Sequence, residues 1–200
     1  MYTVIGHPRS RALRVIWALE ELGQPYEIDP QPPRSEALKS VNGTGKIPVL
    51  KTDDGMISDS LAIITYLADK HGGLTYPAGS FERAHQDALT QYINNELDAA
   101  LWLYTKHSFA LPEDWRVPEV KPTAPKEFAR AMDILAGLKG DQPFMAGNQF
   151  TLADLVLSHC AGWALTVKFT LPDGPFGDFL KSLRKRPAMQ RTLAQVKAAP

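Results

Sequence analysis

The chain has 200 residues, of which 44% are hydrophobic and 22% are charged, a composition typical of a globular protein of one domain or two small ones. Its formal net charge is zero, so nothing in the composition favours a nucleic acid or an anionic membrane as a partner. The single cysteine, Cys160, excludes an internal disulfide and a paired-cysteine redox or zinc motif. No apolar run reaches the roughly 18 residues of a membrane span and no signal peptide is recognisable, so we expect a cytoplasmic protein.

The first half of the chain alternates short strands with helices. Residues 2–5 form a strand, a helix follows to about Leu22, and residues 26–28 form a second strand. This spacing indicates a βαβ unit whose two strands are parallel. Residues 35–40 form a short helix, which leads through a flexible loop to Lys46.

The helix after residue 11 has apolar residues at helical spacing. Its buried face is marked by Ala12, Val15, Leu19 and Leu22. Arg14 and Glu21 share another face of this helix, and Gly23 ends it.

A hairpin and a helix follow Lys46. The turn Asp53-Asp54-Gly55 stands between two short apolar runs, and Pro48 opens the first run, where a strand tolerates proline. The next helix should begin at Ser58-Asp59-Ser60. Its core-facing stripe comprises Leu61, Ile63, Ile64 and Leu67.

This arrangement suits a small zwitterionic peptide. A helix N-terminus offers free N–H groups and a positive dipole end to a carboxylate, and the adjacent Asp59 and Ser60 can hold an ammonium group and a second oxygen. A cis bond before Pro48 would turn the backbone of Ile47 outward to face an extended peptide. The alternative interpretation is a proline at a strand start followed by an ordinary capped helix.

The second half is predicted to be all helical, with a domain boundary near residue 77. A long helix is expected over residues 81–109 and another over 126–138, separated by a proline-rich loop that either covers a site or is an inert connector. Thr151 and Asp154 form a capping box at the start of a further helix, where we assign them a role in folding only.

The end of the chain contains three further features. His159 and Cys160 fall inside the apolar helix, where we expect a buried histidine and an inert thiol rather than a reactive or metal-binding pair. The last helices cover residues 176–184 and 188–196 and are broken by Pro187. A basic run is expected to be a solvated face: Lys181, Arg184, Lys185, Arg186 and Arg191.

The paired motif around Pro48 and Asp59 resembles that of a known family. Two stretches of this chain resemble the glutathione-site signature of soluble glutathione transferases. They are Gly45-Lys46-Ile47-Pro48-Val49-Leu50 and, after it, Asp59-Ser60-x-Ala62-Ile63-x-x-Tyr66-Leu67. Most members of that family carry Glu-Ser where this chain has Asp-Ser. Residues 8–12 and 17–22 most resemble a bacterial and fungal subgroup. The resemblance covers nearly the whole chain and implies an α/β thioredoxin-like domain over residues 1–77 and an all-α helical-bundle domain over residues 78–200.

The resemblance also implies which residues bind glutathione, the co-substrate, with no metal involved. Asp59 and Ser60 would hold the γ-glutamyl end, and Ile47, before a cis bond to Pro48, would pair with the cysteinyl backbone. Lys46 would meet the glycine carboxylate; its alternative is a solvated loop lysine.

Ser10 is the predicted catalytic residue, because the resemblance places it where this fold presents its reactive group. Its hydroxyl could donate a hydrogen bond to the thiolate of bound glutathione, supported by the helix dipole and by Arg9 or Arg11. The alternative is a plain helix cap. Tyr2 is another candidate by residue type, but it lies in the first strand and is expected in the core.

By resemblance the protein is a homodimeric, cytoplasmic glutathione transferase with a role in detoxification. It would activate the glutathione thiolate and transfer it to a small electrophile. An alternative reaction, which uses the same thiolate, is glutathione-dependent reduction of a disulfide or peroxide. The alternative from another class is a non-catalytic binding protein of transferase fold.

Overall fold

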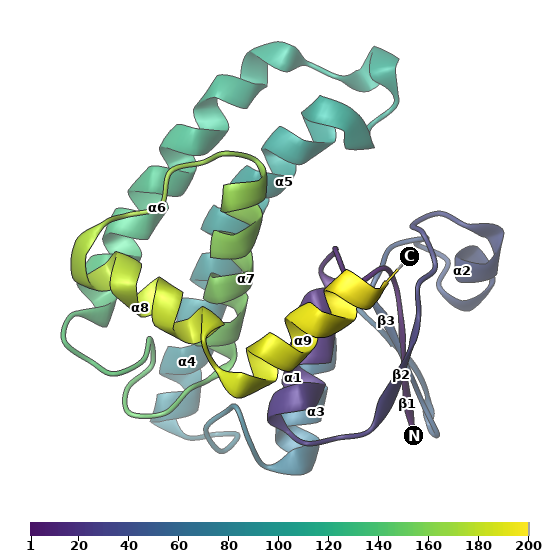
Figure 1. Cartoon of the computed structure of the whole chain (residues 1–200), viewed down its shortest axis with the longest axis horizontal. Helices are drawn as coiled ribbons and strands as arrows, with labels where there is room; N and C mark the ends of the chain where they lie inside the picture. Colours follow the sequence, from purple (N-terminus) through teal and green to yellow (C-terminus); the bar gives the residue numbers. More distant parts are fainter. Residues whose placement is uncertain (200) are drawn as a thin grey trace. The chain divides into compact units, whose positions relative to one another are not determined.

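The computed structural model describes residues 1–199 and divides them into two compact units (Figure 1). The first unit contains Met1–Ala78 together with the C-terminal segment from Arg184, and the second contains Gly79–Leu183. The segment from Arg184 thus shares its contacts with the N-terminal part of the chain. The division of the chain into two domains, residues 1–77 and 78–200, stays a prediction.

A four-stranded mixed sheet forms the centre of the first unit. Its strands are β1 (Tyr2–Ile5), β2 (Tyr26–Asp29), β3 (Val49–Thr52) and β4 (Gly55–Ser58), and their order across the sheet is β2-β1-β3-β4. The pair β1–β2 is parallel, whereas β1–β3 and β3–β4 are antiparallel. This sheet confirms the thioredoxin-like prediction.

Four helices complete the first unit: α1 (Ala12–Glu21), α2 (Glu36–Val41), α3 (Ser60–His71) and α9 (Pro187–Ala198). Helix α1 packs against both α3 and α9. Leu38 of α2 packs on the sheet with Ile5 and Val49. The predicted stripe of α3 is buried at Ile63, Ile64 and Leu67, while Leu61 is only half-buried.

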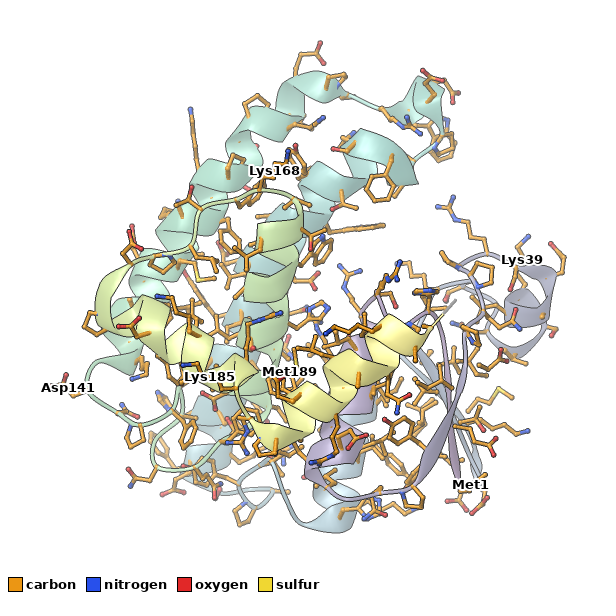
Figure 2. All side chains as sticks on the ribbon, in the orientation of Figure 1. Met1, Lys39, Asp141, Lys168, Lys185 and Met189 are labelled. Atoms are coloured by element: carbon orange, nitrogen blue, oxygen red, sulfur yellow. The ribbon has the colours of Figure 1, made fainter. Side chains whose placement is uncertain are left out.

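Ion pairs join α9 to α1. The guanidinium of Arg186 donates to both oxygens of Glu21, from Nε at 2.6 Å and from Nη2 at 2.8 Å, and Arg191 pairs with Glu20. The prediction of a solvated basic face was therefore wrong for Arg186, whose acidic partner lies 165 residues earlier in the chain, whereas Arg191 is paired but still exposed. Met189 of α9, labelled in Figure 2, is also buried. Ala188 and Thr192 of the same helix are buried as well.

The second unit is helical throughout its regular structure. The long helix expected over residues 81–109 is continuous but contains two π-helical stretches, and it consists of α4 (Phe81–Tyr92), η1 (Ile93–Asp98), α5 (Ala99–Thr105) and η2 (Lys106–Ala110). Two short 3₁₀ helices, η3 (Glu113–Trp115) and η4 (Pro118–Thr123), follow in the proline-rich segment, and then come α6 (Ala124–Lys139), α7 (Leu152–Thr166) and α8 (Gly174–Arg184). None of the helices in residues 1–199 has the length and apolarity needed to cross a membrane.

Helix α7 is the core helix of the second unit, and a capping box starts it as predicted. The N–H of Thr151 donates to Asp154 Oδ2 at 2.9 Å, and the N–H of Met145 donates to Oδ1 at 2.8 Å. Burial raises the pKa of Asp154 above its ordinary value, while the hydrogen bonds oppose that rise. Cys160 is fully buried, as expected, and His159 is 9% exposed.

Candidate functional site

The predicted glutathione residues lie near the ends of three strands. β1 pairs Ile5 with Val49, and β3 pairs Val49 with Ser58. Since β3 is flanked by antiparallel strands on both sides, continuing the two registers places Ile47 between the loop after β1 and the start of α3. The chain also approaches itself closely here: a Cβ added at Gly6, which has φ +139°, would lie 3.0 Å from the Cβ of Ile47. Only glycine fits both requirements.

Ile47 presents its backbone at this edge of the sheet. The bond between Ile47 and Pro48 is cis, as expected from the motif. Within residues 1–199, neither the N–H nor the C=O of Ile47 takes part in a hydrogen bond. Both backbone groups are therefore available to an extended ligand.

Asp59 is the N-cap of α3. Its Oδ1 accepts hydrogen bonds from the N–H groups of Leu61 at 2.8 Å and Ala62 at 3.2 Å. The alternative of a capped helix is therefore realised, and two of the N–H groups that could meet a ligand carboxylate already have a partner. The side chain is nevertheless exposed, and its backbone has φ 77° and ψ 128°, a conformation that is costly for any residue other than glycine. Oδ1 thus serves the helix, whereas no interaction of Oδ2 is found within residues 1–199.

Ser60 follows Asp59 as the first residue of α3 and is 3% exposed. Its Oγ accepts a hydrogen bond from Nη1 of Arg14 at 3.2 Å. Arg14 lies on α1 and is completely buried, so the sequence-based assignment to a face away from the core was wrong. A signal was present: the neighbours of Arg14 in α1 are apolar from Ala12 to Leu19, so most faces of this part of the helix are apolar.

Ser10 lies in the turn between β1 and α1, where its hydroxyl has two local partners. The hydroxyl donates to the carbonyl of His7 at 2.7 Å and accepts from the N–H of Ala12 at 3.1 Å. This is the arrangement of a serine that bonds within its own turn, one residue before Arg11, the N-cap of α1. A hydroxyl that donates to a ligand sulfur has to turn away from the His7 carbonyl first.

The remaining candidates differ in their exposure. Lys46 and Arg9 are exposed. Arg11 is half-buried and takes part in an interaction within the protein. Tyr2 stands at the opposite end of β1 from Ser10, and its hydroxyl is 2.8 Å from Nε2 of His71. Tyr2 therefore does not belong to the group around Ile47, and it is half-buried rather than part of the core.

One group of side chains among the described residues has the chemistry of metal ligands. Asp98, His159 and Cys160 have ligand atoms that all lie within 4.8 Å of one another. All three belong to the second unit, whereas the predicted glutathione residues belong to the first. Each of the three already takes part in an interaction within the protein, and we assign no metal to them.

Comparison with known proteins decides the family. The model of "Glutathione S-transferase, N-terminal domain" matches residues 5–75, and that of "Glutathione S-transferase, C-terminal domain" matches residues 86–191. The chain belongs to the glutathione S-transferase family. A glutathione S-transferase of Pseudomonas putida is 33% identical over 91% of this chain and 86% of its own length.

Two further relatives bear on what a glutathione S-transferase of this sequence does. The solved structure of a sphingomonad glutathione S-transferase complexed with glutathione is 26% identical, covers 98% of both chains and has a TM-score of 0.83. Elongation factor 1-gamma 2 of rice is 28% identical over 97% of this chain but only 48% of its own length. Family membership and the transferase relatives support glutathione binding and a transferase-type function. The elongation factor is a relative that does not bear the name of a transferase.

Proposed function

We propose that this chain binds glutathione in its first unit, activates the thiolate and transfers it to a small electrophile. The observation that carries the proposal is the convergence of Ile47, Asp59 and Ser60 with the loop of Ser10 at one edge of the sheet. The sphingomonad relative supports it, because that protein was solved with glutathione.

The peptide would be bound along its length. Oδ2 of Asp59 would hold the γ-glutamyl ammonium, and the hydroxyl of Ser60 would donate to the neighbouring carboxylate. Ile47 would pair with the cysteinyl residue through its N–H and C=O. Lys46, which is exposed at the end of a loop, would reach the glycine carboxylate as a point charge.

Activation of the thiol requires more than Ser10. Lowering a thiol pKa by two units needs about 2.7 kcal/mol of selective stabilisation of the thiolate. A hydrogen bond to a charged group supplies about 1.5–3 kcal/mol, but the hydroxyl of Ser10 would give up its bond to the His7 carbonyl, worth about 1 kcal/mol. The net contribution of Ser10 is therefore about 0.5–2 kcal/mol. The N-terminus of α1 and either Arg9 or Arg11 would supply the rest.

With the thiolate formed, conjugation is attack of its sulfur on the electrophile, and the protein's part is to lower the thiol pKa and orient the reactants. Reduction of a disulfide or peroxide by the same thiolate is the alternative reaction. We also propose that the protein is a cytoplasmic homodimer with a role in detoxification.

A non-catalytic binding protein is the second candidate function. The similarity to elongation factor 1-gamma 2 favours it, as does the hydroxyl of Ser10, which is already engaged within its own turn. This candidate shares the glutathione site but not the activated thiol.

Three measurements on the purified chain distinguish these functions. Retention on immobilised glutathione tests the site, and turnover of an aryl halide or of a mixed disulfide tests the reaction. Conjugation of the aryl halide is the expected result. Retention without turnover of either substrate would favour the binding protein, and no retention would refute the glutathione site.

A further inference from the structure

Arg14 is a buried charge behind the proposed glutathione site. It is 0% exposed and lies on α1, which packs against α3. Burial of a guanidinium is unfavourable unless acceptors surround it, and one of these acceptors is Ser60 Oγ. Arg14 also takes part in an interaction other than the bond to Ser60, which helps to hold its guanidinium in place.

The hydrogen bond between them fixes what the Ser60 hydroxyl can do. A guanidinium carries donors and no acceptor, whereas a hydroxyl has one proton and two lone pairs. Ser60 Oγ must therefore accept from Arg14, and its own proton is left to donate elsewhere. Ser60 is the first residue of α3, so that proton belongs to the same helix end as the positive end of the helix dipole.

We propose that Arg14 is a positioning residue that makes this subsite select a carboxylate, an inference that rests on the proposed function. Arg14 orients Ser60 as a hydrogen-bond donor and places a positive charge behind the N-terminus of α3. The Ser60 hydroxyl would then meet the ligand's α-carboxylate as a donor, with the positive charge of Arg14 behind it. A primary amide in place of that carboxylate would carry no charge and would present its own N–H groups to this donor.

The test compares two ligands by calorimetry on the full chain. The first ligand is glutathione, and the second is its analogue with the γ-glutamyl α-carboxylate converted to a primary amide. The variants are Arg14→Met, Arg14→Lys, Ser60→Ala and the double variant Arg14→Met/Ser60→Ala. Arg83→Met is the matched control, since Arg83 is 8% exposed but pairs with Asp87 in the second unit. Thermal unfolding of each variant reports whether it is folded.

The wild type should prefer glutathione to the amide, and Arg14→Met should lose about tenfold in glutathione affinity while it binds the amide almost as the wild type does. The loss in the double variant should be smaller than the sum of the two single losses, because part of the arginine's effect passes through the serine. Arg14→Lys, which keeps the charge, should lose less. Arg83→Met should keep the preference for glutathione even if it lowers the melting temperature.

Three results would overturn the inference. An unchanged preference for the carboxylate in Arg14→Met would remove the role assigned to Arg14 while leaving the glutathione site intact. If Arg14→Met does not fold, the same result in Arg14→Lys and Ser60→Ala would do so. Losses of affinity that simply add in the double variant would show that Arg14 does not act through Ser60. A wild type that does not bind glutathione would refute the proposed function and this inference with it.

Discussion

Replacement of Ser10 by alanine separates the two roles that this residue combines. The hydroxyl donates to the His7 carbonyl at 2.7 Å and accepts from the Ala12 N–H at 3.1 Å, so Ser10→Ala should cost about 1 kcal/mol of stability, as loss of a side-chain hydrogen bond does. For a chain of this length that lowers the melting temperature by about 2–4 °C. If Ser10 also donates to the glutathione sulfur, the pKa of the bound thiol should rise by about 0.5–1.5 units, the equivalent of 0.5–2 kcal/mol.

Ultraviolet titration of the thiolate in the bound peptide measures that pKa. Ser35→Ala is the matched control, because Ser35 caps α2 by accepting from the N–H of Leu38 at 3.2 Å but belongs to no predicted site. The control should lose similar stability and leave the thiol pKa unchanged. The rate lost in Ser10→Ala should be greatest near neutral pH and shrink in base, where the thiol ionises without help. An unshifted thiol pKa in a folded Ser10→Ala would refute the catalytic role, and Arg9 or Arg11 would then be tested in its place.

Two further predictions concern stability. Arg186→Met should lower the free energy of unfolding of the first unit, measured in urea, by about 1.5–3 kcal/mol. The substitution leaves Glu21, whose side chain is 10% exposed, without its bidentate partner. This energy is smaller than for a fully buried pair, because the side chain of Arg186 is 30% exposed. The exposed neighbour Lys185 provides the control, and a Lys185→Met variant as unstable as Arg186→Met would contradict the ion pair's role. Asp154 has a pKa raised above its ordinary 3.8 in the folded state, so its contribution to stability is greatest at low pH and is lost as pH rises through the raised value. The difference in unfolding free energy between wild type and Asp154→Asn should therefore shift in favour of the wild type on acidification towards pH 4, and a difference independent of pH would show that burial does not dominate at this carboxylate.

Local sequence patterns predicted several elements of the fold, including those next to the site. The Asp53-Asp54-Gly55 turn, the start of α3 at Ser60 and the capping box of α7 each depend on residues within a few positions of one another, and each is present in the structure. The cis bond before Pro48 followed from the family motif rather than from physics, since a sequence does not report an isomer.

Long-range contacts explain what the sequence did not predict. Arg14 appeared to lie outside the buried face of α1 because α3, which covers it, begins 46 residues later at Ser60. The attachment of α9 through Arg186 and Glu21 joins residues 165 positions apart. The cap formed by Asp59 was weighed as an alternative to ligand binding, yet only one of its two oxygens serves the helix.

Calorimetric titration of glutathione into the wild type and Asp59→Asn tests the central claim most directly. Asparagine is as good an N-cap as aspartate and would bear the same backbone strain at this position, so the variant should keep α3 intact while losing the charge that would hold the γ-glutamyl ammonium. The wild type should bind glutathione, and Asp59→Asn should bind it at least about tenfold more weakly at an unchanged melting temperature, as expected for a lost charge-assisted hydrogen bond. Equal affinities in the two proteins, or no binding to the wild type, would contradict the account.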